Sequence, residues 1–163
     1  MSRSSLKWLV IFLLLFGVLG YCREFFFVNM NNILFMKYYN RESSMPVPRI
    51  MNFFLQFDYN TLYYSKYLFT AIWTLIFFAC SFFALIKLSG SRLLVKLLWY
   101  AYGVLIAASA SAMLYNYLVK DSFSGDEYTL SRWLMGVAQS PIICLILLAS
   151  EKLYKTTTSR NTI

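Results

Sequence analysis

The feature that most constrains this chain is the spacing of its charged residues, which leaves three uncharged stretches of membrane-spanning length. These stretches are Tyr67–Ile86, Leu97–Val119 and Trp133–Ser150. About 20 helical residues cross the roughly 30 Å hydrocarbon core of a bilayer. Only 13% of the 163 residues are charged and 60% are hydrophobic, whereas about a quarter of an average globular protein is charged. The sequence therefore predicts an all-α integral membrane protein.

A fourth span is predicted at the start of the chain. Trp8–Cys22 is uncharged and would be about 22 Å long as a helix, and Lys7 and Arg23 can snorkel outward to lengthen it. A basic start before an apolar run is also typical of a secretory signal peptide. Tyr21 is too bulky for a lipoprotein-type cleavage before Cys22, so we expect a retained anchor. The prediction is a single membrane domain, 1–163, with spans at about 6–22, 67–86, 97–119 and 133–150.

The charge distribution predicts the orientation, because four spans place both termini on one side. Eight Lys and Arg residues would lie on that side, in short tails and in the tight turn at Leu88–Ser91, against seven in the longer connections. The positive-inside rule counts basic residues in short segments. We therefore expect both termini in the cytoplasm and the chain in a bacterial cytoplasmic membrane. Membrane orientation and contact with anionic lipid then account for the net charge of +8. This explanation disfavours a nucleic-acid partner.

The segment 23–66 is predicted to be a long first outer loop that carries interfacial amphipathic helices. Pro46 and Pro48 divide it, because neither can lie inside a helix and each can begin one. After them, apolar residues that include Phe53, Phe54 and Phe57 recur with helical spacing, and an earlier apolar run repeats similarly. Both parts are predicted to lie along the membrane surface. They would anchor the chain laterally or form a lid over the bundle, or else dock another membrane protein through these aromatic side chains.

The third span carries a face of small residues, in which Gly103, Ala107 and Ser111 repeat every four positions. In lipid, no hydrophobic force drives helices together, so small-residue faces and interhelical hydrogen bonds hold a bundle together. We expect this face to pack within the chain, because a four-helix bundle needs such a face. A partner helix is the alternative.

The fourth span offers a second small-residue face at Gly136 and Ser140. Pro141 should kink this helix and leave the carbonyl near Val137 without its helical donor. Gln139 is the most polar residue near the membrane interior. We expect it to make an interhelical hydrogen bond rather than to bind a substrate.

Missing residue types limit the chemistry that the chain can perform. The absence of histidine excludes a histidine-ligated metal and a Ser–His or Cys–His nucleophile pair. The three long stretches contain no Asp, Glu, Lys or Arg at depth, which argues against a proton-coupled pump. Cys22, Cys80 and Cys144 stand singly and are interpreted as small apolar residues. We predict no enzymatic activity, no catalytic residue, no metal and no cofactor.

Four local features of the chain carry a family resemblance. They are the run Arg23–Phe27, the step Pro46–Pro48, the aromatic stretch Tyr63–Phe69, and Arg132 with Pro141 in the fourth span. Together they resemble the small four-span membrane proteins associated with exosortase systems, although this family would have more acidic residues and a proline just after Arg23. The resemblance implies an accessory to a membrane processing enzyme. The exosortase itself is excluded, because its Cys, Arg and His constellation requires a histidine.

Two functions of different classes fit these observations. The preferred one is a non-catalytic accessory or structural subunit of a larger membrane protein complex, which docks through the aromatic outer loop and the small-residue helix faces. The other is a small transporter or channel component for an apolar or weakly polar solute, with Gln139, Ser140 and Ser109 along a polar path. The expected partners are the lipid bilayer and, in the preferred hypothesis, a larger membrane protein.

Overall fold

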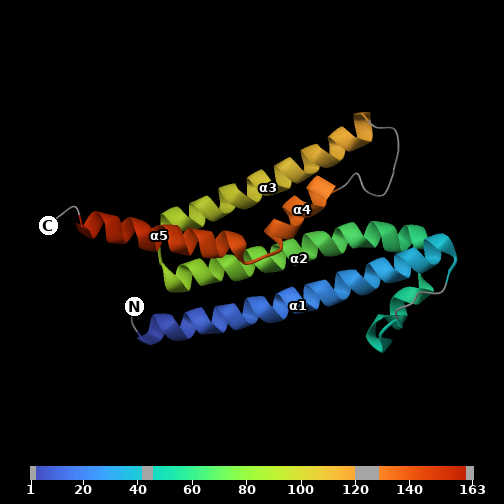
Figure 1. Ribbon diagram of the computed structural model, residues 1–163, viewed down its shortest axis with the longest axis horizontal. Helices are drawn as coiled ribbons and strands as arrows, with labels where there is room; N and C mark the ends of the chain where they lie inside the picture. Colours follow the sequence, from blue (N-terminus) through green and yellow to red (C-terminus); the bar gives the residue numbers. More distant parts are fainter. Residues whose placement is uncertain (1–2, 42–45, 120–128, 161–163) are drawn as a thin grey trace. The chain divides into compact units, whose positions relative to one another are not determined.

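The computed structural model describes residues 3–41, 46–119 and 129–160, and over these ranges it contains helices and no strand. Three of the helices are long and apolar enough to cross a membrane, and a bent helix pair adds a fourth if it is counted as one span. The prediction of an all-α chain with helices of membrane-spanning length is confirmed. The elements, in chain order, are α1 (Arg3–Tyr39), the 3-10 helix η1 (Arg49–Gln56), α2 (Tyr59–Leu88), α3 (Arg92–Val119), α4 (Thr129–Ala138) and α5 (Ile142–Arg160) (Figure 1).

The chain divides into two compact units, and α1 and α2 each contribute to both. The hairpin unit is Gly17–Trp73. The bundle unit contains the residues up to Phe16 and those from Thr74 onward.

The largest departure from the prediction is in α1, which continues through the expected end at Cys22 as far as Tyr39. Arg23 and Glu24 form an ion pair at 3.5 Å on the helix surface, and the Arg23 guanidinium lies 5.6 Å from the centre of the Phe27 ring. Arg and Glu are good helix formers, so charges alone do not end a helix. The first predicted surface helix is therefore part of α1. At 37 residues, α1 is about 55 Å long.

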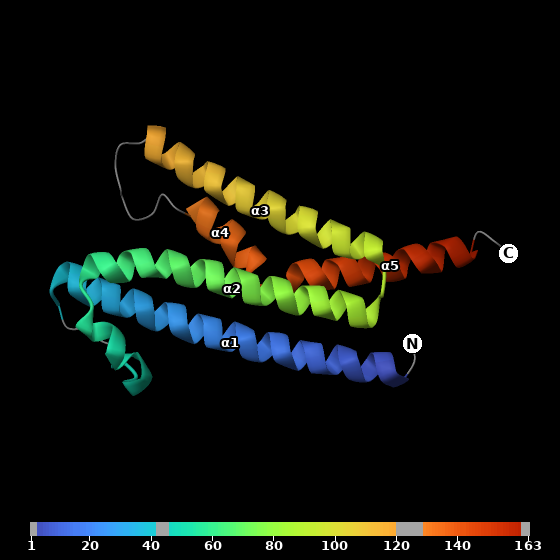
Figure 2. The ribbon, with the colours of Figure 1, turned by 180° about the vertical axis from the view of Figure 1, so that it is seen from behind.

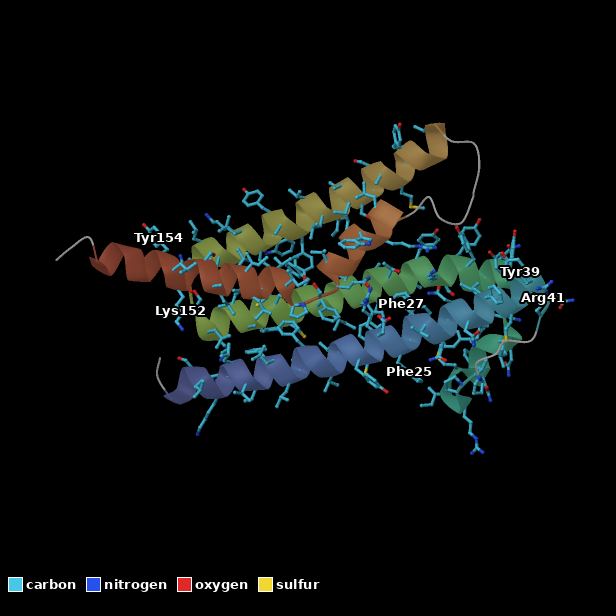
Figure 3. The ribbon with its side chains drawn as sticks, in the orientation of Figure 1. Phe25, Phe27, Tyr39, Arg41, Lys152 and Tyr154 are labelled. Atoms are coloured by element: carbon cyan, nitrogen blue, oxygen red, sulfur yellow. The ribbon has the colours of Figure 1, made fainter. Side chains whose placement is uncertain are left out.

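The end of α1 is set by Asn40, which adopts a left-handed backbone with φ 48°. The Arg41 N–H donates a hydrogen bond to the Met36 carbonyl at 3.3 Å. This is the Schellman arrangement, and Asn is one of the few residues that accept the left-handed position. Figure 3 shows Tyr39 and Arg41 at this end of the helix.

In the hairpin unit, the last part of α1 and the first part of α2 run antiparallel, joined by the segment that contains η1 (Figures 1 and 2). The Lys37 ammonium donates a hydrogen bond to the Leu55 carbonyl at 2.9 Å, which ties η1 to α1. The second predicted surface helix is not α-helical, since residues Arg49–Gln56 form a 3-10 helix. The buried core of this unit consists of Met30, Ile33, Leu34, Met51 and Leu62.

In the bundle unit, α2 and α3 are joined by the predicted tight turn. Gly90 has φ +67°, a conformation that costs glycine little because it has no Cβ. The N–H groups of Ser89 and Gly90 both donate to the Leu85 carbonyl, at 2.9 and 3.1 Å. From this turn α3 runs on to pack against both α4 and α5.

The segment predicted as the fourth span contains two helices, α4 and α5, which meet at an angle of 59°. The predicted kink at Pro141 is thus confirmed. The Val137 carbonyl accepts the Ser140 N–H at 3.2 Å and the Ser140 hydroxyl at 2.7 Å. The carbonyl that proline leaves without a helical donor is therefore satisfied locally, which is what makes such a break tolerable in lipid.

Candidate functional site

The small-residue face of α3 points away from the side on which this helix packs. Gly103, Ala107 and Ser111 are all exposed, whereas Leu98 and Tyr102 are buried. Successive residues are separated by about 100° around an α-helix, which puts the two sets on opposite sides. Apart from neighbouring atoms of its own helix, no atom of the described residues lies within 4 Å of the place that a Gly103 Cβ would take. Among the described residues, the expectation that this face packs within the chain finds no support, and the partner helix stays the alternative prediction.

The second small-residue pair, Gly136 and Ser140, is half-buried. In the part of the chain that the structure describes, the position that a Cβ would take on Gly136 also meets nothing within 4 Å. Ser140 is used by the break itself, because its hydroxyl donates to Val137 and accepts the Ile142 N–H at 3.4 Å. Ser140 therefore takes part in the helix break, whereas Gly136 makes no close helix contact among the described residues.

Gln139 lies in the break between α4 and α5 and is only 3% exposed. Its side-chain Nε2 donates a hydrogen bond to the Thr74 Oγ1 at 3.1 Å, and Thr74 on α2 is 5% exposed. The interhelical hydrogen bond expected of Gln139 is present. Sequence reasoning missed Thr74, because a single hydroxyl in an apolar helix has no pattern that distinguishes it.

A second polar pair joins α3 to α4. The hydroxyl oxygens of Ser109 and Ser131 are 2.7 Å apart, which is a hydrogen bond in either direction. Ser109 is buried, on the packed side of α3. The transport hypothesis placed Ser109 and Gln139 along a polar path, but in this arrangement both contribute to helix packing.

A third polar group lies between α2, α3 and α5 and was not predicted. Ser81, Tyr102 and Cys144 are all buried, and the Cys144 thiol lies 3.9 Å from the Ser81 carbonyl oxygen. The hydroxyls of Ser81 and Tyr102 are enclosed and have no hydrogen-bond partner among the described residues. Unsatisfied buried hydroxyls are uncommon.

The three phenylalanines predicted to dock a partner are not equivalent. The Phe54 ring lies 5.8 Å from that of Phe26 and 5.9 Å from that of Phe69, measured between centroids. Phe57 is also half-buried against the core of the hairpin unit. Phe53 is 60% exposed. Of the predicted set, Phe53 alone has a mostly free face, and Phe54 and Phe57 hold η1 in place.

No cluster of three or more metal-binding side chains occurs in the part of the chain that the structure describes. In the same part, the three cysteines are unpaired thiols, with Cys22 exposed, Cys80 half-buried and Cys144 buried.

Comparison with known protein families, with curated proteins and with solved structures finds no match to this chain.

Proposed function

We propose that this chain is a non-catalytic accessory or structural subunit of a larger membrane protein complex, docked through the small-residue face of α3. The observation that supports this proposal is the exposure of Gly103, Ala107 and Ser111 on the side of α3 opposite its packed residues. Lipid contact alone requires no four-residue repeat of small side chains. Such a repeat lets the backbones of two membrane helices approach closely.

The polar residues inside the bundle unit support the same choice. Gln139 and Ser109 hydrogen bond to Thr74 and Ser131 on other helices, and Ser140 bonds within its own chain segment. A transporter would need these groups to face a solute. In this arrangement they fix the helices of the unit relative to one another, as a structural subunit requires.

The setting of this subunit follows from the charge pattern and from the family resemblance. We propose a bacterial cytoplasmic membrane with both termini in the cytoplasm. The partner would be a membrane processing enzyme of the kind that the exosortase resemblance implies. Cysteines at Arg41 and Lys152, both exposed, test the orientation in a background without the native cysteines. An impermeant maleimide added to intact cells should label R41C and not K152C, and the reverse result would overturn the orientation.

Co-purification of the full chain in mild detergent tests the docking. Ala107→Leu should weaken the association with a larger membrane protein, because a leucine side chain would hold the partner backbone away. Ala108→Leu is the matched control, since Ala108 is also exposed and lies about 100° around the helix from Ala107. Equal association for both variants would remove α3 as the docking helix. A chain that stays alone and moves a solute in vesicles would replace this function with transport.

A further inference from the structure

The two sides of the 3-10 helix η1 differ in exposure, and the residues of each side recur every three positions. Side chains at i and i+3 eclipse one another in a 3-10 helix. Met51 is buried, and Phe54 and Phe57 follow it at intervals of three on the packed side. Ile50 is 82% exposed and Phe53 is 60% exposed. These two large apolar side chains, three positions apart, form one open edge, which we call the Ile50–Phe53 edge.

Ring contacts place this edge at a definite level along α2. Phe54 packs against Phe69, with ring centroids 5.9 Å apart. Phe69 lies just inside the uncharged stretch that begins at Tyr67, directly after Lys66. In a helix that crosses a bilayer, the change from charged to uncharged residues marks the boundary of the hydrocarbon. Because the Phe53 ring is 5.9 Å from the Phe54 ring, the edge lies beside that boundary.

The chemistry of the neighbouring side chains fits the same boundary. Arg49 is exposed next to Ile50 and carries the charge that lipid phosphates attract. Tyr38, Tyr39 and Tyr64 are exposed around the same end of the hairpin unit. Tyrosine is enriched at the level of lipid headgroups, where its ring meets hydrocarbon and its hydroxyl meets water.

We propose that the Ile50–Phe53 edge inserts into the bilayer surface at this end of α1 and α2, with Arg49 among the lipid phosphates. A bilayer is present wherever α2 crosses a membrane, so lipid can cover this edge without a partner protein. The apolar side of an interfacial helix is buried a few ångströms below the headgroups. The geometry of η1 matches this mode, because one side is tied to the protein and the adjacent edge is left open. The inference goes beyond the docking function, which uses α3.

The test uses the full chain, with the native cysteines replaced, in vesicles of phosphatidylcholine and phosphatidylglycerol. A bimane label is placed at I50C on the edge, or at N52C as the matched control, because Asn52 is exposed on the same helix away from the edge. Lipids with a nitroxide on the acyl chain quench labels that lie in the bilayer, and iodide quenches labels in water. We expect about twofold stronger lipid quenching at I50C than at N52C, and weaker iodide quenching. Matching helix content of the two variants checks folding.

Two outcomes would overturn the proposal. Equal quenching of both labels by iodide, with little by lipid, would place the edge in water. Protection of I50C from lipid and iodide alike would show that protein covers the edge. Neither outcome depends on the association measured with Ala107→Leu, so the two proposals can fail separately.

Discussion

The hairpin unit and the bundle unit differ in the polar side chains that they bury. In the hairpin unit, Met30, Ile33 and Leu62 are almost completely buried, and a layer of partly buried aromatic side chains surrounds them. In the bundle unit, buried polar side chains link the helices, as in the Gln139–Thr74 pair. Both units have buried apolar side chains, among them Phe77, Leu85 and Leu98 in the bundle unit, but the buried polar side chains of the described residues all lie in the bundle unit.

A difference in the surrounding solvent would account for this. Burial of apolar side chains stabilises a fold where water is the alternative, whereas in lipid helix association depends on close packing and interhelical hydrogen bonds. A membrane span counted from Lys7 would take about 20 residues of α1, which would place Met30 and Ile33 beyond the hydrocarbon. On this count, the apolar core of the hairpin unit would lie in a region where water competes.

The largest expected effect tests this assignment in α1 itself. Ile33→Ala should lower the free energy of unfolding in mild detergent by about 2–5 kcal/mol, because it leaves a cavity in a buried core. Leu14→Ala in the same helix should change it little, since Leu14 is 67% exposed and its surroundings in micelle and bilayer are apolar. Thermal unfolding followed by circular dichroism measures both. Similar losses for the two variants would mean that the two parts of α1 have the same kind of surroundings.

Much of the fold could be predicted, because uncharged length is a direct signal of a membrane helix. The expected cores of the second and third spans, 67–86 and 97–119, lie inside α2 and α3, and Pro141 marks the break. The first helix was predicted too short because Arg23 and Glu24 were interpreted as a boundary. A helix stops where its backbone hydrogen bonds stop, and in α1 the left-handed residue Asn40 provides that end.

The site residues were harder to predict, because the side of a helix that packs depends on the helices beside it. The spacing of Gly103, Ala107 and Ser111 is visible in the sequence, but which side of α3 packs is decided by the larger residues opposite. The spacing of Phe53, Phe54 and Phe57 suggested an α-helix. Met51, Phe54 and Phe57 repeat every three residues, and that period matches the 3-10 helix observed.

A double-mutant cycle tests the contribution of an interhelical hydrogen bond in the bundle unit. Gln139→Leu and Thr74→Val each remove one partner of the hydrogen bond. Their coupling energy should be about 0.6 kcal/mol and at most about 2 kcal/mol, the range for interhelical hydrogen bonds in membrane proteins. Unfolding of the two single variants and the double variant in the same detergent measures it. Strictly additive effects would show that this pair does not link α2 to the helix break.

The smallest expected effect concerns Ser140, which hydrogen bonds within the break rather than between helices. Ser140→Ala removes the hydroxyl bond to the Val137 carbonyl, but the Ser140 N–H still donates to that oxygen at 3.2 Å. The free energy of unfolding should therefore fall by about 0.5 kcal/mol, the low end for one hydrogen bond. Distances between spin labels on α4 and α5 should stay as in the unchanged chain, because Pro141 imposes the bend. Pro141→Ala should instead lengthen these distances as the helix straightens. If Ser140→Ala straightened the helix as much as Pro141→Ala, the hydroxyl would be the cause of the bend, and polar side chains would set helix direction as well as helix contact in this unit.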